Sequence, residues 1–149
     1  SSDLKLFIMM KEILKSWNSL LEQKKKQDSK QVVKAIIVNS QNKVLFLRRS
    51  DYVEKFAGEW DLPGGHTHVG EGLIVGLRRE VREETALSLG LPIKVVEIEN
   101  IIFYTSRYID GDIILSDEHT EYLFRDVESV KNPNKFEKVA LEVVKNDEF

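Results

Sequence analysis

Three glutamates, Glu80, Glu83 and Glu84, lie close together in the proline-free segment from Leu73 to Leu87. Apolar residues of this segment recur with the spacing of one α-helix face, at Leu73, Leu77 and Val81. At about 100° per residue, Glu80 and Glu84 lie within roughly 20° of Leu73. Like charges beside a buried face destabilise a helix and lose hydration, and a bound cation removes both penalties. Because Mg²⁺ and Mn²⁺ prefer carboxylate oxygens, the pattern favours a divalent-metal site over an ordinary charged helix face.

A break in the chain precedes this helix. Trp60-Asp61-Leu62 is followed by Pro63-Gly64-Gly65, and glycines let a backbone come close to a ligand. A loop that enters a helix N-terminus also offers free amides to an anion. Alone, such a turn is more often only a turn, but its place before the glutamates makes it a candidate phosphate-binding segment.

The spacing of these residues resembles the signature of the Nudix hydrolase family, G-x5-E-x7-R-E-U-x-E-E-x-G-U, in which U is aliphatic. The matching residues are Gly65, Glu71, Arg79, Glu80, Val81, Glu83, Glu84 and Leu87. Ala86 stands where the pattern has glycine. The resemblance extends over roughly residues 31–146 and implies an α/β fold, with a mixed β-sheet between helices.

The resemblance also implies roles for the residues of the motif. Glu83 and Glu84 are expected to bind the metal ion, Mg²⁺ with Mn²⁺ as the alternative, together with the backbone carbonyl of Gly64. Glu80 is either a further ligand or the base that deprotonates water, since the family uses both arrangements. Arg79 lies four residues before Glu83, close enough to pair with it, and is expected to orient the carboxylates.

Two further acids belong to this hypothesis. Glu71 either supports the metal site or is a simple negative charge near a helix start, where the helix dipole favours it. Family members often use a base or ligand from outside the motif, and Glu118 is the candidate here, with Glu121 as its substitute.

Histidine and cysteine counts exclude other chemistries. His66 and His68 form a His-x-His pair, but the chain has three histidines and no cysteine, so solvent-facing side chains are expected rather than a zinc site. Zero cysteines also excludes thiol nucleophiles and disulfides. The isoprenoid diphosphate isomerase branch of the superfamily relies on a catalytic cysteine and is therefore disfavoured.

The reaction implied by the resemblance is hydrolysis of the pyrophosphate bond in a nucleoside diphosphate linked to another moiety. The candidates are a nucleoside triphosphate, a nucleotide sugar, ADP-ribose and a dinucleoside polyphosphate. Arg48 and Arg49 end a predicted strand and are expected to meet substrate phosphates, with a solvated strand end as the alternative. Trp60 and Tyr104 are expected to contact the substrate. A non-catalytic nucleotide-sensing or protein-binding domain is the competing function, although such a domain is expected to have lost one of the glutamates.

Composition sets wider bounds. A chain of 149 residues with 42% hydrophobic residues is enough for one compact core. Its net charge of −3 gives no balance for nucleic-acid binding, and an acidic site needs metal before it accepts a polyphosphate. No apolar run reaches transmembrane length and the first residues lack a signal-peptide block, so we expect a cytoplasmic protein without a membrane partner.

Local patterns predict the elements that position the site. Strands are expected over Val32–Val38 and Val44–Arg49, joined by a hairpin turn, and over residues 93–108, 113–115 and 121–125. Asn134 is expected to cap a closing helix that runs through Val144. The missing motif glycine at Ala86 predicts that the helix of the glutamates runs on toward Gly90.

Residues 1–30 form a separate unit in this scheme, ahead of a hydrolase domain over residues 31–149. Apolar residues from Leu6 to Leu21 keep a helical spacing, and Lys24 to Ser29 reads as the frayed end of the helix. We expect this added N-terminal helix to pack on the domain, in preference to a homodimer contact or a membrane surface.

Overall fold

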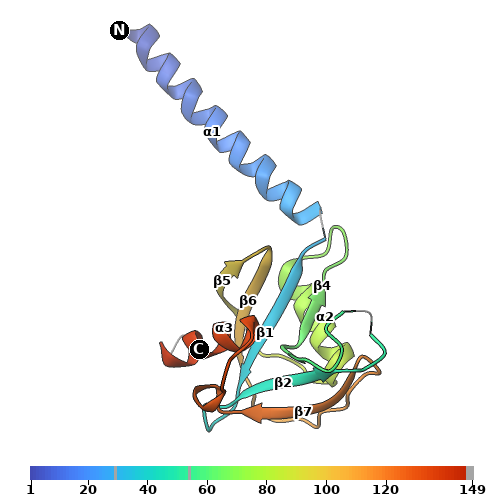
Figure 1. The fold of residues 1–149 in the computed structure, drawn as a ribbon. Helices are drawn as coiled ribbons and strands as arrows, with labels where there is room; N and C mark the ends of the chain where they lie inside the picture. The colour runs from blue at the N-terminus through green and yellow to red at the C-terminus, as the bar shows by residue number, and fades with distance from the viewer. Residues whose placement is uncertain (29, 54, 147–149) are drawn as a thin grey trace.

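The computed structural model describes residues 1–28, 30–53 and 55–146. Its elements follow the order helix, strands, helix, strands, helix (Figure 1). They are α1 (Ser2–Asp28), β1 (Val32–Val38), β2 (Val44–Arg49), β3 (Trp60–Asp61), β4 (Gly64–His66), α2 (Leu73–Thr85), β5 (Ile93–Ile98), β6 (Ile101–Arg107), β7 (His119–Arg125), the 3₁₀ turn η1 (Val127–Ser129) and α3 (Lys135–Lys145).

Within the described residues, seven strands form one mixed sheet. The main path runs β3-β2-β1-β6-β5, while β4 pairs with β1 and β7 pairs with β2. The β1–β6 pair is parallel, with Val32 opposite Ile101, and the other pairs are antiparallel. β1 thus pairs with β2, β4 and β6. Its pairing with β4 holds the turn that follows β3 against the centre of the sheet.

Two cores cover the two faces of this sheet because side chains alternate along β1. Val33, Ala35 and Ile37 share a buried cluster with Leu77 and Val81 of α2. The opposite face packs against α3, in a cluster that includes Ile36, Val38, Ala140 and Val143. A mixed sheet between helices, preceded by an added helix, confirms the predicted α/β class.

The predicted strands 32–38 and 44–49 and the closing helix are confirmed. Asn134 accepts a hydrogen bond from the amide of Glu137, whose side chain in turn accepts one from Asn134, so that α3 starts with a capping box. The strand prediction over 93–108 covers a hairpin instead, because Glu99 and Asn100 both have positive φ and reverse the chain.

A further strand prediction was wrong. Residues 113–115 form no strand, because their polar backbone bonds to the end of α2: the amide of Ile114 donates to the carbonyl of Thr85. In the other direction, the turn-like segment before α2 contains the short strands β3 and β4, which the pattern did not predict.

The prediction that α2 continues toward Gly90 was also wrong. The helix ends at Thr85, and Ala86 takes the left-handed conformation, with φ of 65° and ψ of 6°. Its amide donates to the carbonyl of Arg82, and the Thr85 hydroxyl accepts from the amide of Leu87. The stop that the motif assigns to glycine is therefore made here by an alanine, held by local hydrogen bonds.

α1 does not pack on the domain as expected. It projects away from the sheet (Figure 1), and every residue from Ser1 to Lys24 is exposed. Gln23 of α1 nevertheless lines a cavity beside the start of α2, together with Leu73 and Tyr104. None of the helices in the described residues is long and apolar enough to cross a membrane.

Candidate active site

Two glycines bring the β3–β4 turn against α2. Gly64 has φ of 139°, and a Cβ there would collide with the carbonyl oxygen of Val33 on the neighbouring strand. A Cβ at Gly65 would lie 2.7 Å from Oε2 of Glu80. Because side chains are excluded at both positions, β4 can pass between β1 and the carboxylate of Glu80.

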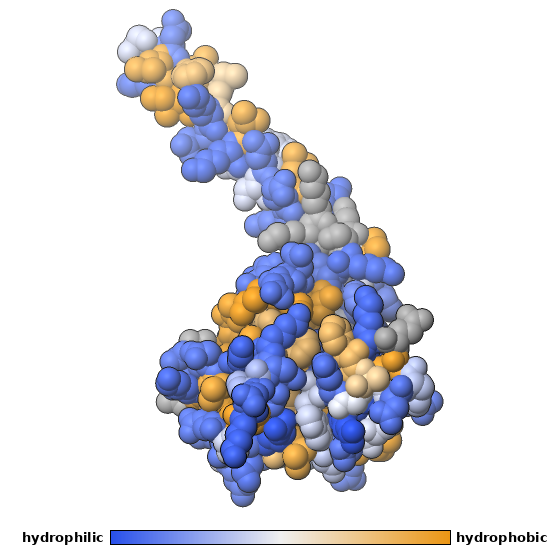
Figure 2. Space-filling view, viewed as in Figure 1, coloured by the Kyte–Doolittle hydropathy of each residue, from blue (hydrophilic) through white to orange (hydrophobic). Residues whose placement is uncertain are grey.

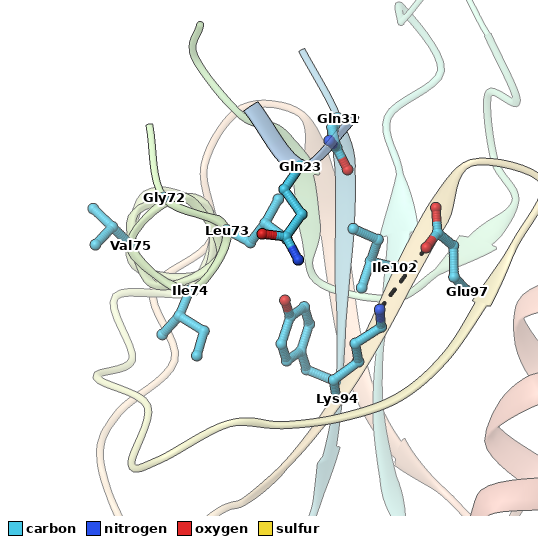
Figure 3. Close-up of a pocket in the computed structure, with 10 residues that line it drawn as sticks. Gln23, Gln31, Gly72, Leu73, Ile74, Val75, Lys94, Glu97 and Ile102 are labelled. Atoms are coloured by element: carbon cyan, nitrogen blue, oxygen red, sulfur yellow. Dashed lines mark ion pairs between the residues drawn. The ribbon is translucent and has the colours of Figure 1, made fainter. Parts of the chain in front are cut away.

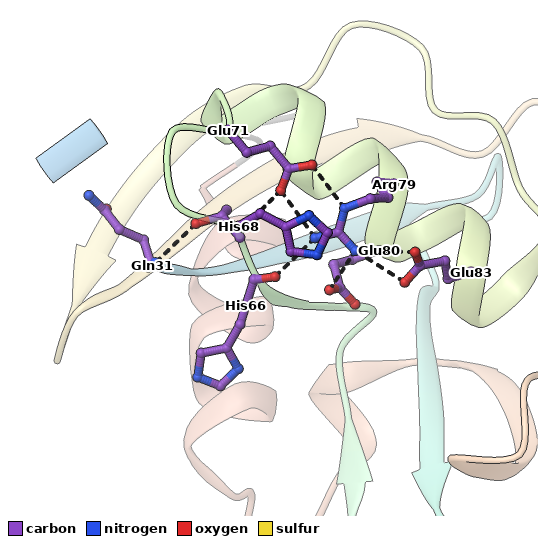
Figure 4. A network of polar contacts seen from close by, with 8 residues as sticks. Gln31, His66, His68, Glu71, Arg79, Glu80 and Glu83 are labelled. Carbon is purple, nitrogen blue, oxygen red and sulfur yellow. Dashed lines mark hydrogen bonds and ion pairs between the residues drawn. The ribbon is translucent and has the colours of Figure 1, made fainter. Parts of the chain in front are cut away.

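Arg79 gathers three glutamates of the motif (Figure 4). Its Nε donates to Glu71 at 2.9 Å, and its Nη1 donates to Glu80 at 3.0 Å and to Glu83 at 3.1 Å. Its Nη2 also donates to the backbone carbonyl of His66. The guanidinium fork therefore ties the start of α2, its middle and strand β4 together.

Electrostatics within this network are strong. The hydrogen bonds from Arg79 and from the amide of His68 lower the pKa of Glu71 from 4.5 to about 2. Glu71 in turn raises the pKa of Arg79 above its ordinary value. Glu71 is thus a fixed carboxylate that anchors Arg79, which agrees with a supporting place beside the metal site more closely than with a simple surface charge.

The pKa of Glu84 is shifted in the opposite direction from that of Glu71. Only 4% of the residue is exposed, and its Oε2 has no hydrogen-bond partner among the described residues. Burial raises the pKa of Glu84 well above the usual 4.5, against the opposing charge of Lys34. Burial likewise raises the pKa of Glu80, with Arg79 opposing the shift. A buried carboxylate oxygen without a partner is a position where a cation is favourable.

His119 faces this carboxylate without neutralising it. Its Nδ1 lies 3.8 Å from Oε2 of Glu84, beyond hydrogen-bond range, and both ring nitrogens are unpaired among the described residues. Burial lowers the pKa of His119 to about 4, so the ring is neutral near pH 7. The negative charge of Glu84 therefore lacks a counter-charge on this side.

The glutamates of α2 open into a cleft of about 540 Å³. Glu80, Glu84 and Glu118 are its acidic lining residues, and Lys34, Arg49 and Lys55 are its basic ones. Such a cleft has the charge pattern that a metal ion and a polyphosphate need together.

Glu118 reaches this cleft through the loop before β7. The amide of Ser50 donates to the carbonyl of Glu118 at 2.8 Å, and the Ser50 hydroxyl donates to the carbonyl of Asp117 at 2.6 Å. On the other side, the amide of Ser116 donates to the carbonyl of Glu84. The loop is thereby held between the end of β2 and the end of α2.

The donors present fit a hard divalent cation. Carboxylates of Glu80 and Glu84 and the backbone of Gly64 line one cleft, and all are oxygen donors. In the part of the chain that the structure describes, no three acidic or histidine side chains are gathered as a finished metal cluster. Glu83, with 58% of its side chain exposed, is held by Arg79. Metal binding by all three glutamates therefore requires Glu83 to exchange a partner.

Three of the residues expected to contact substrate, Arg48, Trp60 and Tyr104, lie outside this cleft. Arg48 pairs with Glu121 at 3.2 Å on the outer surface of β2 and β7 and does not line the cleft. Trp60 packs against the α3-side core, with the guanidinium of Arg125 5.4 Å from its ring. Tyr104 is 4% exposed and belongs to the α2-side core.

Tyr104 borders a second cavity, of about 550 Å³, beside the start of α2 (Figure 3). Leu73, Ile74, Val75 and Ile102 give it an apolar lining, and the Lys94–Glu97 ion pair lies at its side. None of the glutamates of the motif after Glu71 lines it. The structure therefore separates the predicted aromatic contact from the predicted chemistry.

Sequence reasoning missed the ion pair behind the cleft. Lys34 Nζ lies 3.1 Å from Asp61, which also meets Arg49 at 3.4 Å, and the side chains of Lys34 and Asp61 are at most 9% exposed. The available signal was a lysine inside the otherwise apolar run Val32–Val38. A charged side chain in a strand that is buried on both faces needs a buried partner of opposite charge.

Known proteins share this arrangement of elements. A family model described as the NUDIX domain matches residues 28–149. A MutT protein from Methanosarcina mazei Go1 has a similar structure, with a TM-score of 0.64 and 31% sequence identity over 78% of this chain and 93% of that chain. A C. elegans Ap4A hydrolase shares the fold at 16% identity, with a TM-score of 0.60 over 79% of this chain and 96% of that one.

A curated relative matches a shorter segment. The m7GpppN-mRNA hydrolase NUDT17 of Xenopus laevis is 46% identical over 56 residues, which are 37% of this chain and 19% of that protein. The matched part is thus about a fifth of the relative's length. Because the family model covers nearly all of the chain beyond α1, and the M. mazei structure agrees with it in fold and in sequence, this chain belongs to the Nudix hydrolase family.

Proposed function

We propose that this protein is a metal-dependent pyrophosphohydrolase. It cleaves the pyrophosphate bond of a nucleoside diphosphate that is linked to another moiety. The observation that carries the proposal is the cleft in which Glu84, whose buried Oε2 has no hydrogen-bond partner among the described residues, and the cations Arg49 and Lys55 line the same space. Buried carboxylates would repel an anionic ligand that bound without a metal ion. Arg49 and Lys55 would repel a metal ion that bound without an anionic ligand.

The metal ion in this proposal is Mg²⁺, with Mn²⁺ as the alternative. Glu80, Glu83, Glu84 and the carbonyl of Gly64 are the residues we propose to hold it. When bound, such an ion neutralises developing charge on the pyrophosphate oxygens and makes a water molecule more acidic. Arg79 holds Glu80 and Glu83 in reach before the ion arrives, and Glu71 holds Arg79.

Two residues compete for the role of general base. Glu80 has a pKa raised by burial, which makes it a stronger base than an exposed carboxylate. Glu118 lines the same cleft from the loop before β7, whereas Glu121 is engaged with Arg48 outside it. We therefore propose Glu118 over Glu121 as the acid from outside the motif, with Glu80 acting either as ligand or as base.

The remaining residues hold the substrate in this scheme. Arg49 and Lys55 neutralise phosphate oxygens, while Lys34 stays paired with Asp61 and sets the potential of the cleft floor. Arg48, Trp60 and Tyr104 stay predictions as substrate contacts, since none of them lines the cleft. Location in the cytoplasm also stays a prediction.

The substrate class follows from what the relatives have in common. The names Ap4A hydrolase and m7GpppN-mRNA hydrolase describe two proteins that act on nucleotides joined through phosphates. We infer that the pyrophosphate unit is the shared determinant, because the charged lining residues of the cleft suit phosphate groups. The group attached to the nucleoside diphosphate is then a further phosphate, a sugar, a ribose or a second nucleotide.

The test is product analysis by mass spectrometry. The protein is incubated with a mixed panel of nucleoside triphosphates, nucleotide sugars, ADP-ribose, capped RNA and dinucleoside polyphosphates, with and without Mg²⁺. We expect metal-dependent cleavage of one class and a loss of about 10²-fold or more in Glu84→Gln, which keeps the shape of the side chain but removes its charge. Cleavage at the wild-type rate in Glu84→Gln would refute the metal assignment.

A non-catalytic nucleotide-sensing domain is the alternative. It predicts saturable binding of one nucleotide in a calorimeter with no product after prolonged incubation, with either Mg²⁺ or Mn²⁺. The retention of all three glutamates favours turnover: Arg79 holds Glu80 and Glu83, and the buried Oε2 of Glu84 lacks a partner among the described residues, which a binding domain does not need.

A further inference from the structure

α1 carries an apolar stripe with no partner in the domain. In Figure 2, apolar side chains lie along the projecting helix, away from the body of the protein. The stripe consists of Leu6, Phe7, Met9, Met10, Ile13, Leu14, Trp17, Leu20 and Leu21. Each of these residues is between 49% and 61% exposed. Large apolar side chains are seldom gathered on a surface unless they meet another surface.

The spacing of the stripe is that of a helix that packs on another helix. Leu6, Met10, Ile13, Trp17 and Leu20 alternate in steps of four and three residues. This is the heptad repeat of helices that wrap around each other. At about 100° per residue the full stripe covers an arc of roughly 160°. Lys15 and Ser19 lie on the opposite side, where Leu4 and Ile8 are the exposed apolar residues outside the stripe. One long helix face is therefore specified for burial.

An isolated helix of this composition has little reason to be stable. Helices without tertiary contacts are marginal in water, and β-branched and aromatic residues lower helix propensity. The nine stripe residues each expose about half of their surface, so pairing them removes roughly 100 Å² apiece, or about 900 Å² per copy. That area matches the roughly 800 Å² per partner of a specific interface.

Charge argues against a membrane as the covering surface. Six lysines (Lys5, Lys11, Lys15 and Lys24–Lys26) and four acids (Asp3, Glu12, Glu22 and Asp28) lie along α1, so its polar residues carry both signs with a small basic excess. Each basic residue near an anionic bilayer contributes only about 1 kcal/mol, and residues 31–149 bring a net charge of −6 that the bilayer repels. A second copy of the same helix offers a polar face that also carries both signs, and the exposed helix holds the two acidic domains away from the contact.

We propose that α1 is a self-association helix, whose stripe pairs with the stripe of a second copy of this chain. The pairing leaves the candidate active-site cleft free, since every residue of α1 from Ser1 to Lys24 is exposed and the cleft is lined by other elements. Gln23 lies at the cavity beside the start of α2, outside the stripe. Turnover per chain is consequently independent of the pairing. The inference holds whether or not the proposed function is correct.

The experiment measures the mass of the full chain by light scattering after size exclusion, over a hundred-fold range of concentration. We expect twice the 17.2 kDa of one chain for the wild type. Ile13→Glu/Trp17→Glu places two carboxylates in the stripe and should shift the protein to monomer. The control Lys15→Gln/Ser19→Glu changes the net charge by the same amount on the opposite face and should stay dimeric.

A second readout uses the absence of cysteine in the chain. Under mild oxidation, Ile13→Cys near the middle of the stripe should form a disulfide-linked dimer, in a parallel as in an antiparallel pair, whereas Lys15→Cys should not. A wild-type monomer at all concentrations, or equal cross-linking of both variants, overturns the proposal. A monomer that floats with phosphatidylserine vesicles also overturns it and assigns the stripe to a membrane surface.

Discussion

Replacing Ala86 by glycine should stabilise this protein, although most glycine substitutions near a helix destabilise. Ala86 ends α2 with φ of 65°, a conformation in which an L-residue other than glycine places Cβ too close to a carbonyl oxygen. The residue is exposed, so losing its methyl group removes little buried surface. Ala86→Gly restores the residue that the motif has at this position.

The magnitude follows from two opposing terms. The left-handed conformation costs a non-glycine residue roughly 1–2 kcal/mol, and glycine avoids that cost. Glycine also gives the unfolded chain more freedom, which costs roughly 0.5–1 kcal/mol. The net expectation is a gain of about 0.5–1 kcal/mol in the free energy of unfolding. For a chain of this length that corresponds to a rise of about 1–4 °C in Tm.

Urea titration and thermal unfolding followed by circular dichroism measure this difference. Ala140→Gly is the matched control, because it deletes the same methyl group from the buried interior of α3. There glycine should lower the free energy of unfolding by about 1 kcal/mol or more. The reasoning is refuted if Ala86→Gly lowers stability as Ala140→Gly does, since the left-handed conformation would then carry no strain.

Three further results are expected. In thermal unfolding, Mg²⁺ at ten times its Kd should stabilise the wild type by about 1.4 kcal/mol and so raise its Tm. Chelation should reverse that gain and Glu84→Gln should lack it; an equal shift in Glu84→Gln would place the ion elsewhere. Because the pKa of Glu71 is lowered to about 2, its carboxylate stabilises the fold above pH 4.5, and this contribution is lost as the pH falls toward 2. Glu71→Gln should therefore be less stable than the wild type at pH 6 and equal to it near pH 2 in urea titrations, and a constant gap would contradict the pairing with Arg79. Lys34→Met should lose about 3 kcal/mol in the same assay, since the buried Asp61 then keeps only Arg49 as a paired cation besides the amide of Leu62. An unchanged free energy of unfolding would show that Asp61 does not need Lys34 as its partner.

Elements with a strong local signal were predictable. The apolar spacing of α2 and the runs 32–38 and 44–49 each report one buried face, and Asn134 caps α3 through its own side chain. β3 and β4 were missed because strands of two and three residues contain too few side chains to show a period. Their existence depends on β2 and β1, which supply the hydrogen-bond partners.

The candidate site divides in the same way. The pairing of Arg79 with Glu83 is a contact between neighbours on one helix, so spacing alone predicted it. The burial of Glu84 and the Lys34–Asp61 pair depend on how strands from distant parts of the chain meet. Arg48 shows the limit in the opposite direction, since its neighbour Arg49 lines the cleft and Arg48 does not. Side chains alternate along a strand, so the choice between the two is made by the face that the sheet covers.

The sequence by itself determined the family, the oxygen-donor chemistry and the helices, because these depend on residue types at short, fixed separations. Tertiary structure alone decided that Glu84 lacks a partner, that Tyr104 lies apart from the carboxylates and that α1 stands away from the domain. The physical reason is that burial and the pairing of charges are properties of whole surfaces in contact. Such surfaces are assembled from segments far apart in the chain, and no local period records which of them will meet.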